Sequence, residues 1–188
     1  MNGQFEAAWK LHVFLTGHGI PYAIIGGIAV QRWGQPRLTR DVDLTILLRP
    51  GSEEAALRQI VAAFPARLED AIAFALEHRV LPVDVPGCGE ADISLGLPGY
   101  EEDVIARAVA YDLGDGREVR LCSAEDLIVH KALAGRPQDV LDIEGIVARH
   151  GATLDVAYVR RWLDELGRAA DDPEVRARFE RAWAARLG

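Results

Sequence analysis

Two aspartates, Asp41 and Asp43, stand one residue apart at the start of the apolar run DVDLTILL. The β-branched and aliphatic residues of this run predict a central strand from Asp41 to Leu48, which Arg49-Pro50-Gly51 ends. Residues two apart in a strand point to the same face of the sheet, with Cα atoms about 6.6 Å apart. Their carboxylates can converge on Mg²⁺, a cation that prefers oxygen ligands and often binds substrate phosphates as well.

An Asp-Val-Asp sequence can also mark the solvated end of an edge strand. The run Leu44 to Leu48 favours instead a strand that is buried on both faces after its first residues. Carboxylates at the start of such a strand are costly unless charged partners or metals compensate them. The pair is therefore a candidate metal site.

Two glycines, Gly26 and Gly27, lie upstream between a short apolar strand, Tyr22 to Ile25, and the helical sequence IAVQRW. At the junction of a strand and a helix, backbone N–H groups can approach a phosphate with no Cβ in the way. Alone the pair is a weak indication, because paired glycines usually only make a tight turn.

The combination of strand, Gly-Gly, intervening segment and Asp-Val-Asp resembles the motif of the polymerase-β-like nucleotidyltransferase superfamily. Within it, the chain looks most like the AbiEii/AbiGii toxin-type nucleotidyltransferases of bacterial toxin–antitoxin and phage-defence systems. The resemblance implies a Mg²⁺- or Mn²⁺-dependent enzyme that transfers an NMP group from an NTP to an acceptor hydroxyl. Asp41 and Asp43 would then be catalytic metal ligands, and Gly26 and Gly27 would contact the nucleotide.

The family pattern includes a third acidic residue on a later strand, which helps to bind the metal and can accept the proton of the acceptor. Asp92, in Ala91-Asp92-Ile93, fits this pattern, and Asp84 is the competing candidate. We prefer Asp92 because Pro82 and Pro86 bracket Asp84 and make its run a poor central strand.

Further nucleotide contacts are implied by the same resemblance. Thr39 occupies the hydroxyl position that often precedes the paired acids. Arg40, with Arg32 and Arg37, forms a basic segment that can neutralise triphosphate charge or hold a phosphate-bearing acceptor. Scattered surface arginines are the alternative interpretation.

Lys131 lies in a segment, EDLIVHKALAGRPQDVLDIEGI, that resembles the helical part of AbiEii-like proteins. By that resemblance Lys131 would contact the triphosphate, with Asp139 and Asp142 nearby. The alternative is an ordinary solvated helix face whose ion pairs contribute little.

The predicted fold class is α+β: a small mixed β-sheet nucleotidyltransferase core flanked by helices, with a C-terminal helical bundle. The predicted domains are a core over residues 1–121 and a helical region packed on it over residues 122–188, where every segment has helical periodicity. In the core, the expected helices span Gln4 to Thr16, Ser52 to Phe64, Glu69 to His78 and Tyr100 to Val109, and the other expected strands span Val80 to Val85, Ala91 to Leu95 and Glu118 to Cys122.

The composition gives 21 Lys+Arg against 29 Asp+Glu and a formal net charge of -8, which disfavours an extended nucleic-acid surface. The two cysteines form no CxxC motif, and the N-terminus lacks the features of a signal peptide. With no apolar stretch of about 18 residues, we expect a cytoplasmic protein that does not enter a membrane.

The sequence does not identify the acceptor, which can be RNA such as tRNA, a protein or a small molecule, or say whether a cognate antitoxin protein binds the chain. A catalytically silent nucleotide-binding or partner-binding module is the alternative function. A sugar transferase using Asp-x-Asp is a further alternative, but it predicts a longer Rossmann-like array.

Overall fold

The computed structural model describes residues 3–39 and 41–186. The chain divides into two compact units, one of Met1–Gly27 and Leu38–Cys122 and the other of Ile28–Arg37 and Ser123–Gly188. The division falls inside the helix α2 (Gly26–Trp33). The short segment Ile28–Arg37 therefore belongs to the same unit as the C-terminal helices. The predicted domains, 1–121 and 122–188 with the second packed on the first, stay a prediction.

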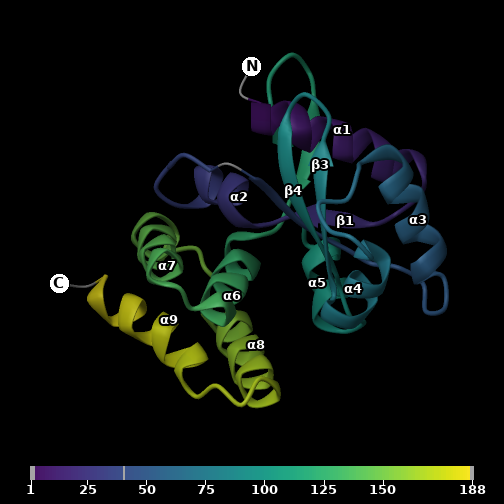
Figure 1. Cartoon of the computed structure of the whole chain (residues 1–188). Helices are drawn as coiled ribbons and strands as arrows, with labels where there is room; N and C mark the ends of the chain where they lie inside the picture. Colours follow the sequence, from purple (N-terminus) through teal and green to yellow (C-terminus); the bar gives the residue numbers. More distant parts are fainter. Residues whose placement is uncertain (1–2, 40, 187–188) are drawn as a thin grey trace. The chain divides into compact units, whose positions relative to one another are not determined.

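The first unit contains a six-stranded mixed sheet, with strand order β3-β4-β2-β1-β6-β5 (Figure 1). Parallel pairing joins β2 to β4 and β1 to β6, and the other neighbours are antiparallel. The strands are β1 (Tyr22–Ile24), β2 (Asp41–Ile46), β3 (Val80–Val85), β4 (Gly89–Leu95), β5 (Val109–Asp112) and β6 (Glu118–Leu121).

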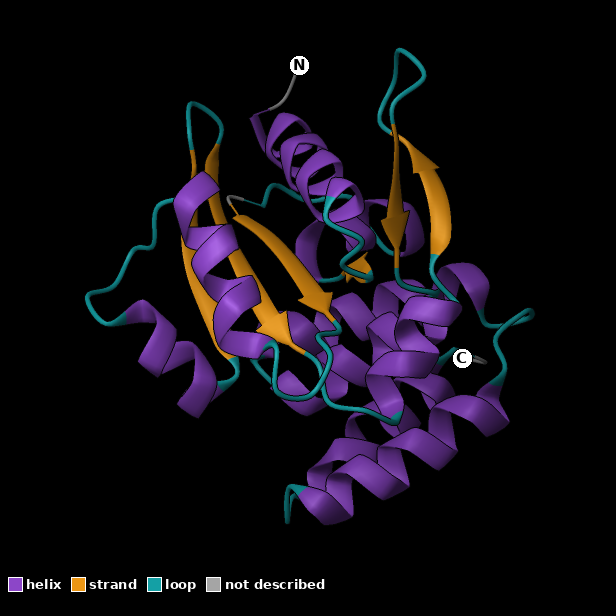
Figure 2. Ribbon diagram, turned by 90° about the vertical axis from the view of Figure 1, so that its right-hand side faces the viewer, coloured by secondary structure: helices purple, strands orange, loops and turns teal. Residues whose placement is uncertain are grey.

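The helix α1 (Gly3–Gly17) lies beside the strands (Figure 2) and contacts β2, β3, β4 and β6. Its residues Ala8, Leu11 and Leu15 are buried at three- and four-residue spacing, which places them on one helix face. The first unit also contains α3 (Glu53–Ala63), α4 (Ala71–His78) and α5 (Tyr100–Ala106).

The central strand β2 separates its polar start from its apolar body. Val42, Leu44 and Ile46 are fully buried on one face of the sheet, because alternate residues of a strand point the same way. On the other face Asp41 and Asp43 are half-buried. The expected burial of both faces after the first residues is confirmed, although the strand ends at Ile46 rather than Leu48.

The second unit is helical from Ser123 onward. The hydroxyl of Ser123 accepts a hydrogen bond from the backbone N–H of Asp126, which caps the first of these helices. Leu127, Ile143, Val159 and Phe179 are fully buried, one from each helix. The helices are α6 (Ala124–Ala134), α7 (Pro137–His150), α8 (Val156–Ala169) and α9 (Glu174–Ala185).

The α+β architecture expected from the sequence is confirmed, with one element corrected. The helix expected to reach Val109 ends at Ala106, and Val109 begins the edge strand β5. This strand pairs with β6 across a turn in which Leu113 N–H donates to the carbonyl of Arg117 over 2.8 Å. Within the described residues, no helix is long and apolar enough to cross a membrane.

Candidate functional site

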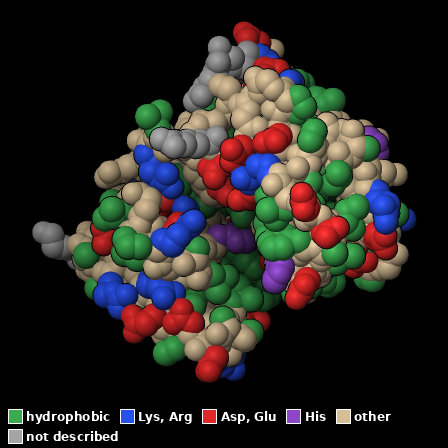
Figure 3. All heavy atoms as spheres, in the orientation of Figure 1, with side chains coloured by type: hydrophobic (Ala, Val, Ile, Leu, Met, Phe, Trp, Pro, Cys, Tyr) green, Lys and Arg blue, Asp and Glu red, His purple; other side chains and the backbone are tan. Residues whose placement is uncertain are grey.

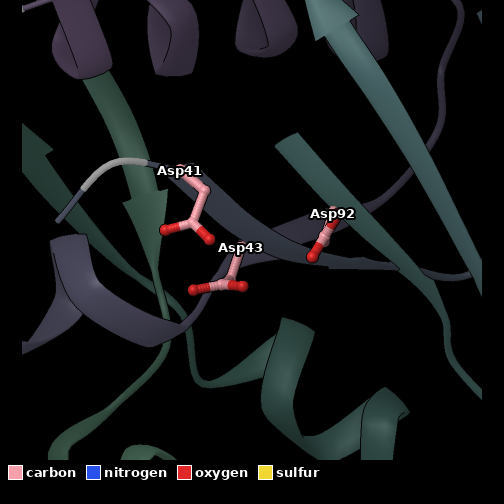
Figure 4. A group of neighbouring side chains, drawn as sticks. All are labelled: Asp41, Asp43 and Asp92. Carbon is pink, nitrogen blue, oxygen red and sulfur yellow. The ribbon is translucent and has the colours of Figure 1, made fainter. Parts of the chain in front are cut away.

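Three carboxylates meet on one face of the sheet in the first unit. Asp41 and Asp43 come from β2, and the parallel register pairs Asp43 directly with Asp92 on β4. One carboxylate oxygen from each residue lies within 4.8 Å of the others. Figure 4 shows the three side chains projecting from their strands toward a common space. The structure thus brings together the three acids that the sequence singled out.

The donor set of this cluster suits a hard divalent cation. Three half-buried carboxylates offer only oxygen ligands, which Mg²⁺ and Mn²⁺ prefer. Two ligands on opposite sides of one Mg²⁺ are separated by roughly 4.2 Å, twice the metal–oxygen distance. The observed separations of up to 4.8 Å need only a small adjustment to reach that geometry.

Gly26 is placed against Asp43 so closely that no side chain fits between them. A Cβ added to Gly26 would lie 1.9 Å from Oδ2 of Asp43, and the φ of Gly26 is +62°. Both the contact and the backbone conformation require glycine. Gly26 is the first residue of α2, so the glycines open the helix rather than form a separate turn before it.

Gly27 is restricted in the same way by Thr39. A Cβ on Gly27 would lie 2.3 Å from Oγ1 of Thr39. The Thr39 hydroxyl is 3.1 Å from Oδ1 of Asp41, to which it donates a hydrogen bond. Gly27 therefore leaves room for a buried threonine that orients the first carboxylate.

The basic segment is only partly described. Arg40 lies outside the described residues. In the second unit, the guanidinium carbon of Arg32 lies 4.5 Å from the centre of the Trp33 ring. Arg37 donates two hydrogen bonds to Asp142, of 3.0 and 2.9 Å, so its guanidinium binds this carboxylate in a bidentate manner.

Lys131 is buried in the second unit between two carboxylates. Its ammonium nitrogen lies 2.7 Å from Asp139 and 2.8 Å from Asp142, and all three side chains are at most 6% exposed. Burial raises the pKa of both carboxyls, but hydrogen bonds from Lys131, Arg136 and Arg37 outweigh it and lower the pKa overall. The solvated helix face considered from the sequence is therefore wrong, and contact of Lys131 with a triphosphate stays a prediction.

We expect Lys131→Met to lower the free energy of unfolding by about 3 kcal/mol, because it leaves two buried carboxylates short of a partner. Arg181→Ala is the control: its ion pair with Glu174 is 61% and 58% exposed and should contribute about 0–1 kcal/mol. Urea unfolding followed by circular dichroism measures both values. Equal losses in the two variants would contradict the role assigned to the buried pair.

Sequence reasoning missed a guanidinium beside the cluster. Arg67 donates hydrogen bonds to Asp92 and, over 2.9 Å, to Glu90. Figure 3 shows acidic side chains gathered around basic ones over the sheet. Arg67 lies 25 residues before Asp92 in the sequence, and no local motif connects the two. Only the pairing of strands reveals their contact.

A scan of the sequence against protein-family models gives no match, and a search of the curated proteins gives none either. Solved structures with a similar fold include an antigenic nucleotidyltransferase-like protein from Paracoccidioides brasiliensis, with a TM-score of 0.57, 18% identity and coverage of 94% of this chain and 91% of that one. Another is the antibiotic-resistance factor ANT(2'')-Ia, with a TM-score of 0.58, 20% identity and coverage of 89% and 94%.

These similarities concern the fold. The chain shares its fold with the nucleotidyltransferase-like protein and with ANT(2'')-Ia, along most of its length and of theirs. This agrees with the superfamily that the Gly-Gly and Asp-Val-Asp motifs resemble. At 18 to 20% identity, the chemistry has to be argued from the site itself.

Proposed function

We propose that the chain is a Mg²⁺- or Mn²⁺-dependent nucleotidyltransferase that moves an NMP group from an NTP to an acceptor hydroxyl. The observation that carries the proposal is the convergence of Asp41, Asp43 and Asp92 beside Gly26, where the backbone comes close to a carboxylate. The three carboxylates offer only oxygen ligands, the kind that Mg²⁺ and Mn²⁺ prefer. The shared fold supports the same assignment.

In the proposed reaction, the acceptor oxygen forms a bond to the α-phosphorus and the bond from that phosphorus to the bridging oxygen breaks, which releases pyrophosphate. Bound divalent cations would supply charge neutralisation for the reacting oxygens. Asp41 and Asp43 would hold these cations, and Asp92 would share this task and accept the proton of the acceptor hydroxyl. Thr39 keeps Asp41 oriented through its hydrogen bond.

In this proposal, groups next to the carboxylates bind the triphosphate. The backbone N–H groups of Gly26 and Gly27 begin a helix, where free donors and the helix dipole favour anions. Arg40 supplies positive charge to the β- and γ-phosphates, as the sequence resemblance implies, and a contact of Lys131 with the triphosphate stays a prediction from the same resemblance.

The acceptor class distinguishes two forms of the proposal. The resemblance to AbiEii/AbiGii-type proteins favours a toxin that modifies tRNA or protein and is neutralised by an antitoxin. The name of ANT(2'')-Ia as an antibiotic-resistance factor favours a small-molecule acceptor. We give preference to the toxin form, because the motif resemblance extends from Ile24 into the segment around Lys131.

To test the proposal, the protein is incubated with each α-labelled NTP, Mg²⁺ or Mn²⁺, total bacterial RNA and lysate. We expect transfer of label with release of pyrophosphate from one or more NTPs, and the labelled fraction names the acceptor class. Binding of NTP without pyrophosphate release would favour the catalytically silent module instead. Growth arrest on expression of the wild-type chain, absent for Asp43→Ala, tests the toxin form.

A further inference from the structure

The segment that carries Arg67 is fixed to the outer edge of the sheet. It connects α3 to α4 and runs along β3, the terminal strand of the sheet. Ala66 forms an antiparallel bridge with Val83, and Arg67 N–H donates to the carbonyl of Pro82 over 3.1 Å. The backbone of Arg67 is therefore held by the sheet.

The register places Arg67 at the end of a row that crosses the sheet. Pro82 pairs with Asp92, and Asp92 pairs with Asp43. Side chains of directly paired residues lie on the same face of a sheet. Since Ala66 is opposite Val83, Arg67 is opposite Pro82, and the row reads Arg67, Pro82, Asp92, Asp43. Arg67 thus approaches Asp92 from the side away from Asp43.

The guanidinium of Arg67 donates hydrogen bonds to two different carboxylates. One terminal nitrogen donates to Oε2 of Glu90 and the other to Oδ1 of Asp92. These acids lie two apart on β4 and share a face, so one planar group fixes both. The hydrogen bond is made to Oδ1 of Asp92 and does not use Oδ2.

We propose that Arg67 is a positioning residue that orients the Asp92 carboxylate toward the cation, an inference that rests on the proposed function. The Asp92 side chain is 39% exposed, so without a partner it is free to change rotamer. Hydrogen bonds to a metal-ligating carboxylate hold it in the binding geometry, and their loss typically lowers metal affinity or activity about 10- to 100-fold.

The test measures Mn²⁺ affinity, with no nucleotide or acceptor, by the electron paramagnetic resonance signal of free Mn²⁺. We expect Arg67→Ala to weaken binding about tenfold. Arg58→Ala removes the same charge from an exposed ion pair with Glu54 on α3 and should bind Mn²⁺ as the wild type does. Arg67→Lys keeps the charge without the planar fork and should weaken binding about threefold or more.

A double-mutant cycle tests whether Arg67 acts through Asp92. In an Asp92→Asn background, adding Arg67→Ala should change Mn²⁺ affinity little, because the carboxylate it orients is already gone. If Arg67→Ala changes Mn²⁺ affinity equally in the wild-type and Asp92→Asn backgrounds, the inference is overturned. Unchanged or tighter Mn²⁺ binding by Arg67→Ala would also overturn it, because that result is expected if the guanidinium only competes with the cation. If Asp92→Asn weakens binding and Arg67→Ala does not, only this inference fails. A wild-type chain that binds no Mn²⁺ would overturn the proposed metal centre as well.

Discussion

Asp43→Ala should lower nucleotide transfer at least about 100- to 1000-fold, because the chemistry depends on groups held in place to neutralise charge on the reacting oxygens. Its stability should not fall. Asp43 lies directly opposite Asp92 in the sheet, and like charges in directly opposite positions destabilise a sheet. We therefore expect a thermal midpoint equal to or above that of the wild type.

Asp84→Ala is the matched control for Asp43→Ala. Asp84 is exposed on the edge strand β3, where the register pairs it with Glu90. This variant should retain transfer within about twofold, since Asp84 is exposed and lies two strands from Asp41, and exposed substitutions usually change little. Transfer close to wild type by Asp43→Ala, or a collapse of its fold, would remove the basis of the proposed mechanism.

Gly26→Ala should abolish most transfer by a steric route. The added Cβ would meet Oδ2 of Asp43 at 1.9 Å, and the neighbouring atoms are the carboxyl carbon at 2.6 Å and Cβ at 2.7 Å. Either the carboxylate or the start of α2 must move, and a displacement of about 1 Å in a catalytic group can cost about 100-fold. Steady-state kinetics with a labelled NTP measure the loss.

Gly19→Ala separates that contact from backbone strain. Its φ of +64° almost equals the +62° of Gly26, but an added Cβ would meet nothing within 4 Å. Both variants should lose about 1 kcal/mol of stability from the left-handed conformation, whereas only Gly26→Ala should also lose transfer. A comparable loss of transfer in both would show that the approach of Gly26 to Asp43 is not what matters.

Local patterns were sufficient to predict the parts of the site that are close in sequence. The alternation of Asp41, Val42, Asp43 and Leu44 predicts a strand with two carboxylates on one face, and the structure has that strand at the centre of the sheet. Pro82 and Pro86, on either side of Asp84, predicted that this run is a poor central strand. In the structure the run is β3, which lies at the edge of the sheet.

Features that depend on long-range pairing could not be predicted from local patterns. The contact of Arg67 with Asp92 requires the register of β3 on β4 and a bridge from Ala66 to Val83. The edge strand β5 is only four residues long and half-exposed, so its sequence carries little apolar alternation. The burial of Lys131 depends on its ion pairs with Asp139 and Asp142 from the next helix. Helical periodicity alone does not predict that these two acids are buried.

The measurement that tests the central claim most directly is an anomalous-scattering map of crystals grown with Mn²⁺ and a non-hydrolysable NTP analogue. We predict one or two Mn²⁺ peaks within about 2.3 Å of oxygens from Asp41, Asp43 and Asp92, with the triphosphate completing their coordination. Peaks that avoid these carboxylates, or a bound nucleotide with no Mn²⁺ beside them, would contradict a metal-dependent transfer at this site.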